Sequence, residues 1–109
     1  MIKAKFDFEA KKITGVNIRS FVIRETNGAD EMLAASIVEA KGKGAMLTEE
    51  LTRLAIVEVD GAPVVQPFGA IDTWNTKTRS FVSAAYKKIN LPTVEESDDF
   101  LASAVLMPE

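Results

Sequence analysis

The stretch "LAIVEVDGAPVV", residues 54–65, constrains the fold of this chain more than any other. Asp60 and Gly61 stand between two runs rich in β-branched residues. A two-residue hairpin turn needs positive φ at both positions, which Asp-Gly tolerates. The sequence therefore predicts a hairpin over residues 54–65, and a helix over residues 51–57 is the competing interpretation. Because Pro63 lacks a backbone donor, the second strand is expected at a sheet edge.

The first 24 residues predict another pair of strands, over residues 2–24. Apolar and charged side chains alternate along "IKAKFDF", residues 2–8, which is the pattern of a half-buried strand. A polar turn ends at Gly15, and the β-branched and aromatic residues that follow favour the partner strand. The sequence leaves open whether the first 17 residues pair within the chain or form an arm that reaches a neighbouring subunit.

Residues 28–41 predict a helix with signals at both ends. Thr26 or Asn27 supplies the N-cap, and acidic residues in the first turn suit the helix dipole. An apolar stripe around Leu33 gives the helix a buried face. The "KGKG" that follows ends the helix, and residues 46–54 add one or two further helical turns in this interpretation.

The C-terminal third predicts a helical hairpin. A helix over residues 72–90 begins at the N-cap Asp72 or Thr73 and is stopped by Pro92. A capping box of the form S/T-x-x-E then begins a helix over residues 93–106. The short link predicts that the two helices pack antiparallel. The expected face of the first consists of Trp74, Thr78, Phe81, Val82, Ala85 and Ile89. The expected buried side of the second consists of Val94, Phe100, Leu101, Ala104 and Val105.

The chain has no cysteine and no histidine among its 109 residues. Disulfides, thiol nucleophiles, thiolate or imidazole metal sites and histidine acid–base chemistry are therefore excluded. The acidic run at residues 95–99 lacks the spacing of a calcium-binding loop. We expect a protein that is not an enzyme and that needs no cofactor or metal. A hydrophobic content of 47% supports a core, so we expect one small α+β domain over residues 1–109.

The net charge of −3 conceals alternating blocks of charge. The chain is net positive before residue 25, negative over residues 25–60, positive over 61–90 and negative after that. Such blocks attract one another within a domain or across a subunit interface. None has the charge density of a nucleic-acid-binding face. There is also no apolar run of membrane-spanning length and no hydrophobic block of a signal peptide. We expect no nucleic acid, no membrane and a cytosolic location.

Three stretches resemble tail assembly chaperones of long-tailed bacteriophages. "FVIRETNGADEMLAA" resembles the R-E-x-x-G-x-D-E start of the first helix in that family, and "VEVDGAPV" resembles its short central hairpin. "WNTKTRSFVSAAYKKINLPTVEESDDFLASA" resembles its closing pattern of W-x-x-x-T-R, an apolar helix and a final acidic helix that ends F-L-x-x-A. The resemblance covers most of residues 18–105. The residues that carry over are Arg24, Glu25, Gly28, Asp30, Glu31, Trp74, Thr78, Arg79, Phe81 and Tyr86.

The resemblance implies a non-enzymatic function in the host cell cytoplasm. Proteins of that family bind the tape measure protein, a long and largely helical chain that aggregates, and they keep it soluble. They help the tail tube protein assemble around it and leave before the virion is complete. One alternative is a virion structural protein, such as a tail tube or completion subunit. Another is a small phage-encoded regulator that binds a host protein.

A chaperone for an amphipathic helical client needs an apolar groove with a charged rim. We expect helices 28–41, 72–90 and 93–106 to line such a groove, and a homo-oligomer to lengthen it and to cover edge strands. The candidate partner-binding residues are Met32, Leu33, Ile37, Trp74, Arg79, Phe81 and Tyr86. The sequence leaves open whether Trp74 is buried.

Overall fold

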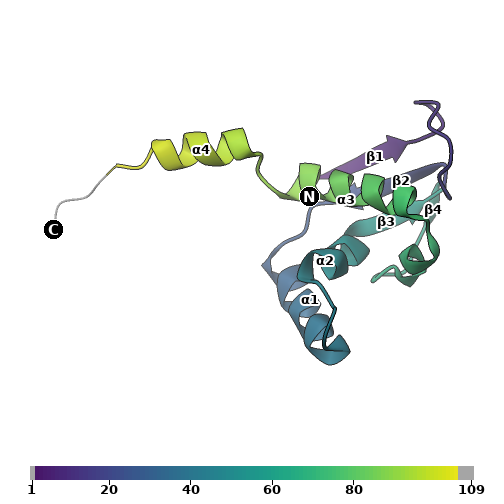
Figure 1. Ribbon diagram of the computed structural model, residues 1–109, viewed down its shortest axis with the longest axis horizontal. Helices are drawn as coiled ribbons and strands as arrows, with labels where there is room; N and C mark the ends of the chain where they lie inside the picture. The colour runs from purple at the N-terminus through teal and green to yellow at the C-terminus, as the bar shows by residue number, and fades with distance from the viewer. Residues whose placement is uncertain (1, 106–109) are drawn as a thin grey trace.

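A computed structural model describes residues 2–105, which form a four-stranded antiparallel sheet with helices packed on it (Figure 1). The strands lie in the order β1-β2-β3-β4, and the predicted α+β class is confirmed. The elements are β1 (Lys3–Asp7), β2 (Ser20–Arg24), α1 (Gly28–Lys41), α2 (Leu47–Ala55), β3 (Ile56–Val59), β4 (Ala62–Pro63), the 3-10 helix η1 (Gly69–Thr73), α3 (Thr76–Asn90) and α4 (Val94–Ala102).

The turn between β3 and β4 has the predicted Asp-Gly geometry. Asp60 and Gly61 have φ values of 52° and 82°. The Asp60 carboxylate also accepts hydrogen bonds from the backbone N–H groups of Arg19, at 2.6 Å, and Ser20, at 3.1 Å. One side chain therefore shapes the hairpin and ties it to the start of β2. Pro63 lies in the edge strand β4, as predicted.

The N-terminal strand pairs within its own chain. β1 runs antiparallel to β2, with Phe6 opposite Phe21, so it is not an arm to a neighbouring subunit in this structure. Asn17 in the connecting loop is held on α3. Its backbone N–H donates to Thr78 Oγ1 at 3.0 Å, and its side-chain oxygen accepts from the Asn75 N–H at 2.7 Å. The loop and the first turn of α3 are thus one hydrogen-bonded unit.

The core lies between the sheet and the helices α2 and α3. Its fully buried side chains include Phe21 and Ile23 from β2, Ile56 from β3 and Val82 from α3. α1 packs on α2 instead of the sheet, and Ala34 is its only residue classed as buried. Within residues 2–105, no helix has the length and apolar character needed to cross a bilayer.

The hairpin strand begins two residues later than predicted. Leu54 and Ala55 are buried and complete α2, and β3 begins at Ile56. The competing interpretation of a helix was therefore right for the first part of residues 51–57. All six residues 50–55 are buried, so this part of α2 is covered on every side. Periodicity alone does not distinguish such a buried helical segment from a strand.

The helix predicted over residues 72–90 begins at Thr76. Asn75, and not Asp72 or Thr73, is the N-cap, and its side chain accepts a hydrogen bond from the Thr78 N–H at 2.9 Å. The preceding residues form η1 instead. This start is selected because Asn75 Nδ2 also donates a hydrogen bond to the Gly15 carbonyl at 2.9 Å. The two residues are far apart in the sequence.

The predicted antiparallel packing of the last two helices differs from the structure. α4 begins at the predicted capping box of Thr93 and Glu96, but it buries none of its residues and extends away from the sheet (Figure 1). Leu91 and Thr93 both have extended backbone, with φ and ψ of −115° and 144° and of −71° and 164°. The link therefore directs α4 outward and does not turn it back onto α3. The residues expected on its buried side are all exposed: Val94, Phe100, Leu101, Ala104 and Val105. Residue 106 of the predicted helix lies outside the described residues.

Candidate functional site

Four phenylalanine rings meet where the β1 edge of the sheet lies against α3. Phe6 stacks on Phe21 with ring centroids 5.3 Å apart, and Phe8 lies 5.6 Å from Phe21. Phe81 of α3 contacts Phe8 edge to face at 5.3 Å. The rings line a cavity of about 320 Å³, which we call the phenylalanine pocket. Its lining residues are Lys5, Phe6, Asp7, Phe8, Ala10, Lys11, Ile13, Phe21 and Phe81.

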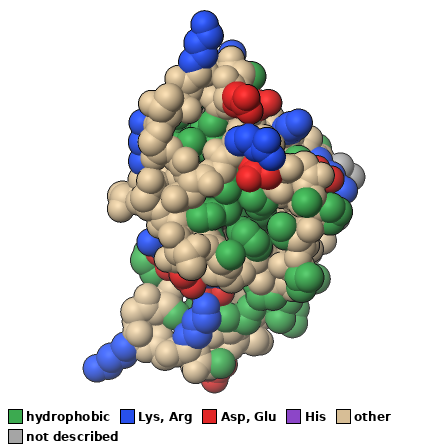
Figure 2. Space-filling model, turned by 90° about the vertical axis from the view of Figure 1, so that its right-hand side faces the viewer, with side chains coloured by type: hydrophobic (Ala, Val, Ile, Leu, Met, Phe, Trp, Pro, Cys, Tyr) green, Lys and Arg blue, Asp and Glu red, His purple; other side chains and the backbone are tan. Residues whose placement is uncertain are grey.

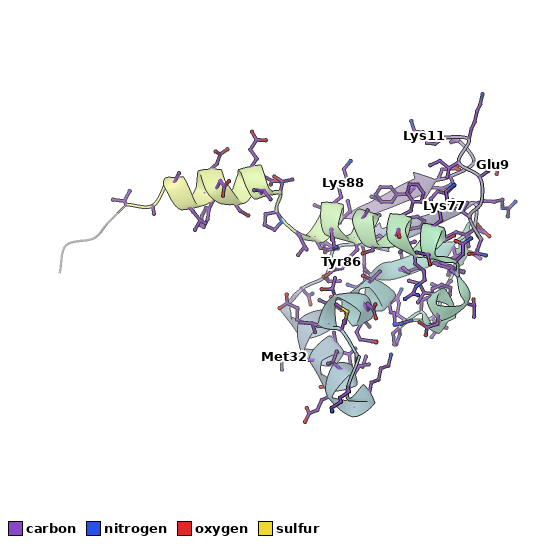
Figure 3. The ribbon with its side chains drawn as sticks, viewed as in Figure 1. Glu9, Lys11, Met32, Lys77, Tyr86 and Lys88 are labelled. Carbon is purple, nitrogen blue, oxygen red and sulfur yellow. The ribbon has the colours of Figure 1, made fainter. Side chains whose placement is uncertain are left out.

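The phenylalanine pocket has an apolar floor and a charged rim. Phe8 and Phe21 are buried, whereas Phe81 is 38% exposed. The exposed Lys5 and Lys11 add charge at the opening, and Figure 3 shows Lys11 in the loop beyond β1. β1 is also one of the two edge strands of the sheet. This arrangement suits an amphipathic ligand, because apolar side chains enter the cavity while charged ones remain at the rim.

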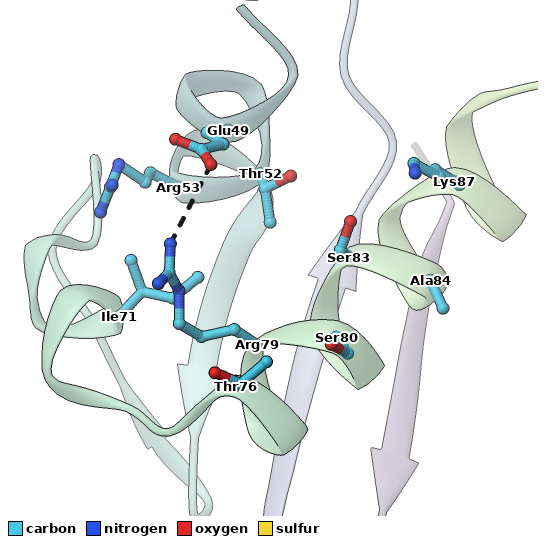
Figure 4. A pocket seen from close by; sticks show the side chains of 10 residues that line it. All are labelled: Glu49, Thr52, Arg53, Ile71, Thr76, Arg79, Ser80, Ser83, Ala84 and Lys87. Carbon is cyan, nitrogen blue, oxygen red and sulfur yellow. Dashed lines mark ion pairs between the residues drawn. The ribbon is translucent and has the colours of Figure 1, made fainter. Parts of the chain in front are cut away.

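A second hollow lies between α2 and α3, and we call it the α2–α3 groove (Figure 4). It has a volume of about 490 Å³. Its lining residues are Glu49, Thr52, Arg53, Ile71, Thr76, Arg79, Ser80, Ser83, Ala84 and Lys87. They include three cations, one acid and several hydroxyl groups. The groove therefore combines apolar surface with an excess of positively charged side chains.

Arg53 forms an ionic network at the α2 wall of this groove. Its Nη2 donates to the Asp72 carboxylate at 2.7 Å, and its Nε lies 3.5 Å from Glu50, which also accepts from Lys41 at 2.6 Å. The hydrogen bond from Arg53 holds the pKa of Asp72 below its ordinary value. The Arg53 side chain is 9% exposed, and its Nε and Nη1 atoms have no hydrogen-bond partner among the described residues.

The other two cations of the groove are weakly engaged. Arg79 Nη2 lies 4.0 Å from Glu49 Oε1, and both side chains are more than 40% exposed, so this pair contributes little stability. Lys87 is exposed and makes no ion pair within the described part of the chain. Both are free to meet an anionic ligand.

The predicted partner-binding residues do not line one common groove. Met32 and Leu33 are 76% and 49% exposed on α1, and Ile37 is half-buried. α1 packs on α2, and α2 packs on α3, so α2 separates α1 from α3 (Figure 1). Met32 lies on the outer side of α1 (Figure 3). Arg79 belongs to the α2–α3 groove and Phe81 to the phenylalanine pocket.

Trp74 is half-buried, which answers the question that the sequence left open. It follows η1 and packs on Phe68, with ring centroids 5.3 Å apart. η1 lies on the right-hand side of Figure 1, and Figure 2 shows hydrophobic side chains gathered in the middle of that face. The exposed part of the Trp74 side chain remains a candidate for contact with a partner.

Tyr86 is 2% exposed and is therefore a structural residue. Its hydroxyl and that of Thr26 lie 3.3 Å apart and share a hydrogen bond. Asn90, one turn later, accepts from the Thr26 N–H at 2.7 Å. Tyr86 faces the domain and Lys88 points away from it (Figure 3). Tyr86 was a candidate for partner binding and was not part of the expected face of this helix, but α3 buries a wider face than the sequence predicted.

Arg24 and Asp30, from the R-E-x-x-G-x-D-E stretch, form a bidentate pair. The two guanidinium nitrogens of Arg24 donate to the two carboxylate oxygens of Asp30 at 2.9 and 2.8 Å. These hydrogen bonds lower the pKa of Asp30. Asp30 also completes the capping box with Asn27 at the start of α1. These motif residues thus fix the junction of β2 and α1.

The sequence did not predict most of the residues that line the two cavities. Phe6, Phe8 and Phe21 were expected only as strand residues, although the two neighbouring strands offered three aromatic rings to one face. Arg53 and Lys87 were not expected to line one groove, because α2 and α3 come together only in the fold. No group of three or more potential metal ligands is found in the described residues.

Comparisons with protein-family models, with curated proteins and with solved structures found no match.

Proposed function

We propose that this protein is a tail assembly chaperone of a long-tailed bacteriophage that binds the tape measure protein and keeps it soluble in the host cytoplasm. The phenylalanine pocket is the observation that carries the proposal. It offers an apolar cavity of about 320 Å³ beside charged side chains. A largely helical, amphipathic client exposes the matching surface, in which apolar side chains stand one or two turns apart. The resemblance of the three sequence stretches supports the same function.

The position of Phe81 suits contact with a client. It is the most exposed ring of the four, at 38%, yet it is fixed by edge-to-face contact with Phe8. A rigid, partly exposed aromatic anchor binds with little loss of conformational entropy. Lys5 and Lys11 at the rim would pair with acidic residues on the polar face of the client helix.

Co-expression with the tape measure protein of the same phage tests the proposal. We expect the client to remain in the soluble fraction and to co-elute with the chaperone in gel filtration. Phe81→Ser should release the client, whereas Phe100→Ser, a matched change on the exposed α4, should not. Circular dichroism should confirm that both variants are folded.

Two results would overturn the proposal. One is a client that is as insoluble with the protein as without it. The other is the protein in stoichiometric amounts in purified virions, which would indicate a structural subunit. A complex that survives Phe81→Ser but is lost with Met32→Ser would move the client site from the phenylalanine pocket to α1.

A further inference from the structure

We infer that α4 of one copy of this chain docks in the α2–α3 groove of a second copy. The interface would join unlike surfaces, an acidic amphipathic helix and a basic groove. This inference does not depend on the proposed function, because it concerns contacts between identical chains.

α4 exposes a surface that is suited to burial against another protein. Phe100 and Leu101 are 75% and 68% exposed, and Val94 is 79% exposed. At 100° per residue these three side chains fall within about 120° of the helix circumference. Such an exposed apolar stripe on a short helix is typical of a segment that binds in a groove.

The carboxylates of α4 flank this apolar stripe. Glu96 lies next to Phe100 on one side, and Asp98 lies next to Val94 on the other, again from a rotation of about 100° per residue. Asp98, Asp99 and Glu95 make no ion pair within residues 2–105. The helix therefore presents an apolar stripe with unpaired negative charge beside it.

The α2–α3 groove is complementary to α4 in charge, chemistry and length. Arg79 and Lys87 at its α3 wall are exposed and weakly engaged. Ala84 gives apolar surface between them on α3, Ile71 of η1 also lines the groove, and Ser80 and Ser83 are small enough for a helix to approach closely. From Thr76 to Lys87 the wall is about 17 Å long, and the nine residues of α4 span about 14 Å.

The occupant is the helix of a second copy because the link does not return α4 to its own groove. Leu91 caps α3, its N–H donating to the Lys87 carbonyl at 2.9 Å, and the Thr93 capping box starts α4 two residues later. Leu91 and Thr93 both have extended backbone, so α4 projects outward. The radius of gyration is 16.4 Å, whereas a compact chain of this length would have about 13 Å. The outward helix is thus available to a neighbour.

Charge reversal in the isolated full-length chain tests the inference. We expect wild-type protein to self-associate in sedimentation velocity as its concentration rises, and more weakly as salt is added. Asp98→Lys on α4, and Arg79→Glu/Lys87→Glu in the groove, should each weaken self-association by about tenfold or more. Lys3→Glu/Lys43→Glu, which changes two exposed lysines outside the groove, should leave it unchanged.

Mixing the two charge-reversed chains provides the decisive measurement. Each chain alone should be monomeric, because its altered surface no longer complements the unaltered one. The mixture should associate, because the unaltered α4 of the groove variant meets the unaltered groove of the α4 variant. Circular dichroism shows whether each variant is folded. A wild-type chain that is monomeric at all concentrations, or a mixture that does not associate, would overturn the inference.

Discussion

α3 and α4 follow one another in the chain, and both begin at side-chain N-caps, yet only one of them belongs to the core. α3 buries Thr78, Val82, Ala85 and Tyr86, whereas α4 buries none of its residues. The difference is not in the local signals. α3 is held by hydrogen bonds from the loop after β1 and by ring contacts, and these partners come from distant parts of the sequence. Caps and periodicity specify that a helix forms, and tertiary contacts decide whether it packs.

The test with the largest expected effect introduces a carboxylate on each of the two helices. Val82 is fully buried, so Val82→Asp should destabilise the fold by about 4 kcal/mol or more and should leave much of the chain unfolded. Phe100→Asp on α4 should change the free energy of unfolding by about 0.5 kcal/mol or less. Urea denaturation followed by fluorescence of Trp74 measures both. Equal losses would show that α4 packs on the domain in solution.

The second test compares a paired carboxylate with an unpaired one. Asp30→Asn should lower the free energy of unfolding by about 2 kcal/mol at pH 7, because it weakens the bidentate pair with Arg24. Asp98→Asn should have almost no effect. The measurement is urea denaturation of both variants and the wild type at several pH values.

The pH dependence of that difference has a definite sign. Hydrogen bonds from Arg24 keep the pKa of Asp30 in the folded protein below its ordinary value. The stabilisation is therefore fully present above the unfolded pKa of about 4 and is lost as the pH falls through the lowered folded value. The stability gap between the wild type and Asp30→Asn should close in that range. A gap that is constant down to pH 2 would contradict the assignment.

The smallest test removes one N-cap from each helix. Asn75→Ala should lower the global free energy of unfolding by about 1 to 2 kcal/mol, because Asn75 caps α3 and also binds Gly15. Thr93→Ala should speed hydrogen exchange within α4 and leave global stability unchanged. Denaturation and amide exchange together distinguish the two outcomes. If Thr93→Ala also made hydrogen exchange faster in α3, the two helices would unfold as one unit.

The parts of the fold that depend on residues close together in the sequence were predictable. The Asp60-Gly61 turn, the edge position of Pro63 and the capping box at Thr93 follow from local chemistry, and the structure contains all three. The start of α3 was not predictable, since Asn75 is selected by contacts with Asn17 and Gly15. Those contacts exist only after the loop has folded onto the helix.

The candidate sites were less accessible to sequence reasoning than the fold. The pairing of Phe6 with Phe21 depends on strand register, and the contact of Phe8 with Phe81 depends on how α3 crosses the sheet. Tyr86 was expected at a surface because a helical projection does not show how much of a helix the domain covers. Charge patterning did indicate attraction between blocks, but it did not indicate which helix would be left outside the core.

The two edge strands of the sheet are protected in different ways against pairing with strands of other chains. β4 has only two residues, and one of them is Pro63, which has no N–H to offer an incoming strand. β1 is longer, and its exposed side chains Lys3, Lys5 and Asp7 are charged. Charged residues on an edge strand act as gatekeepers against cross-β fibres. Both edges of the sheet therefore resist the addition of a strand from another chain, so copies of this domain are not expected to join edge to edge into one continuous sheet.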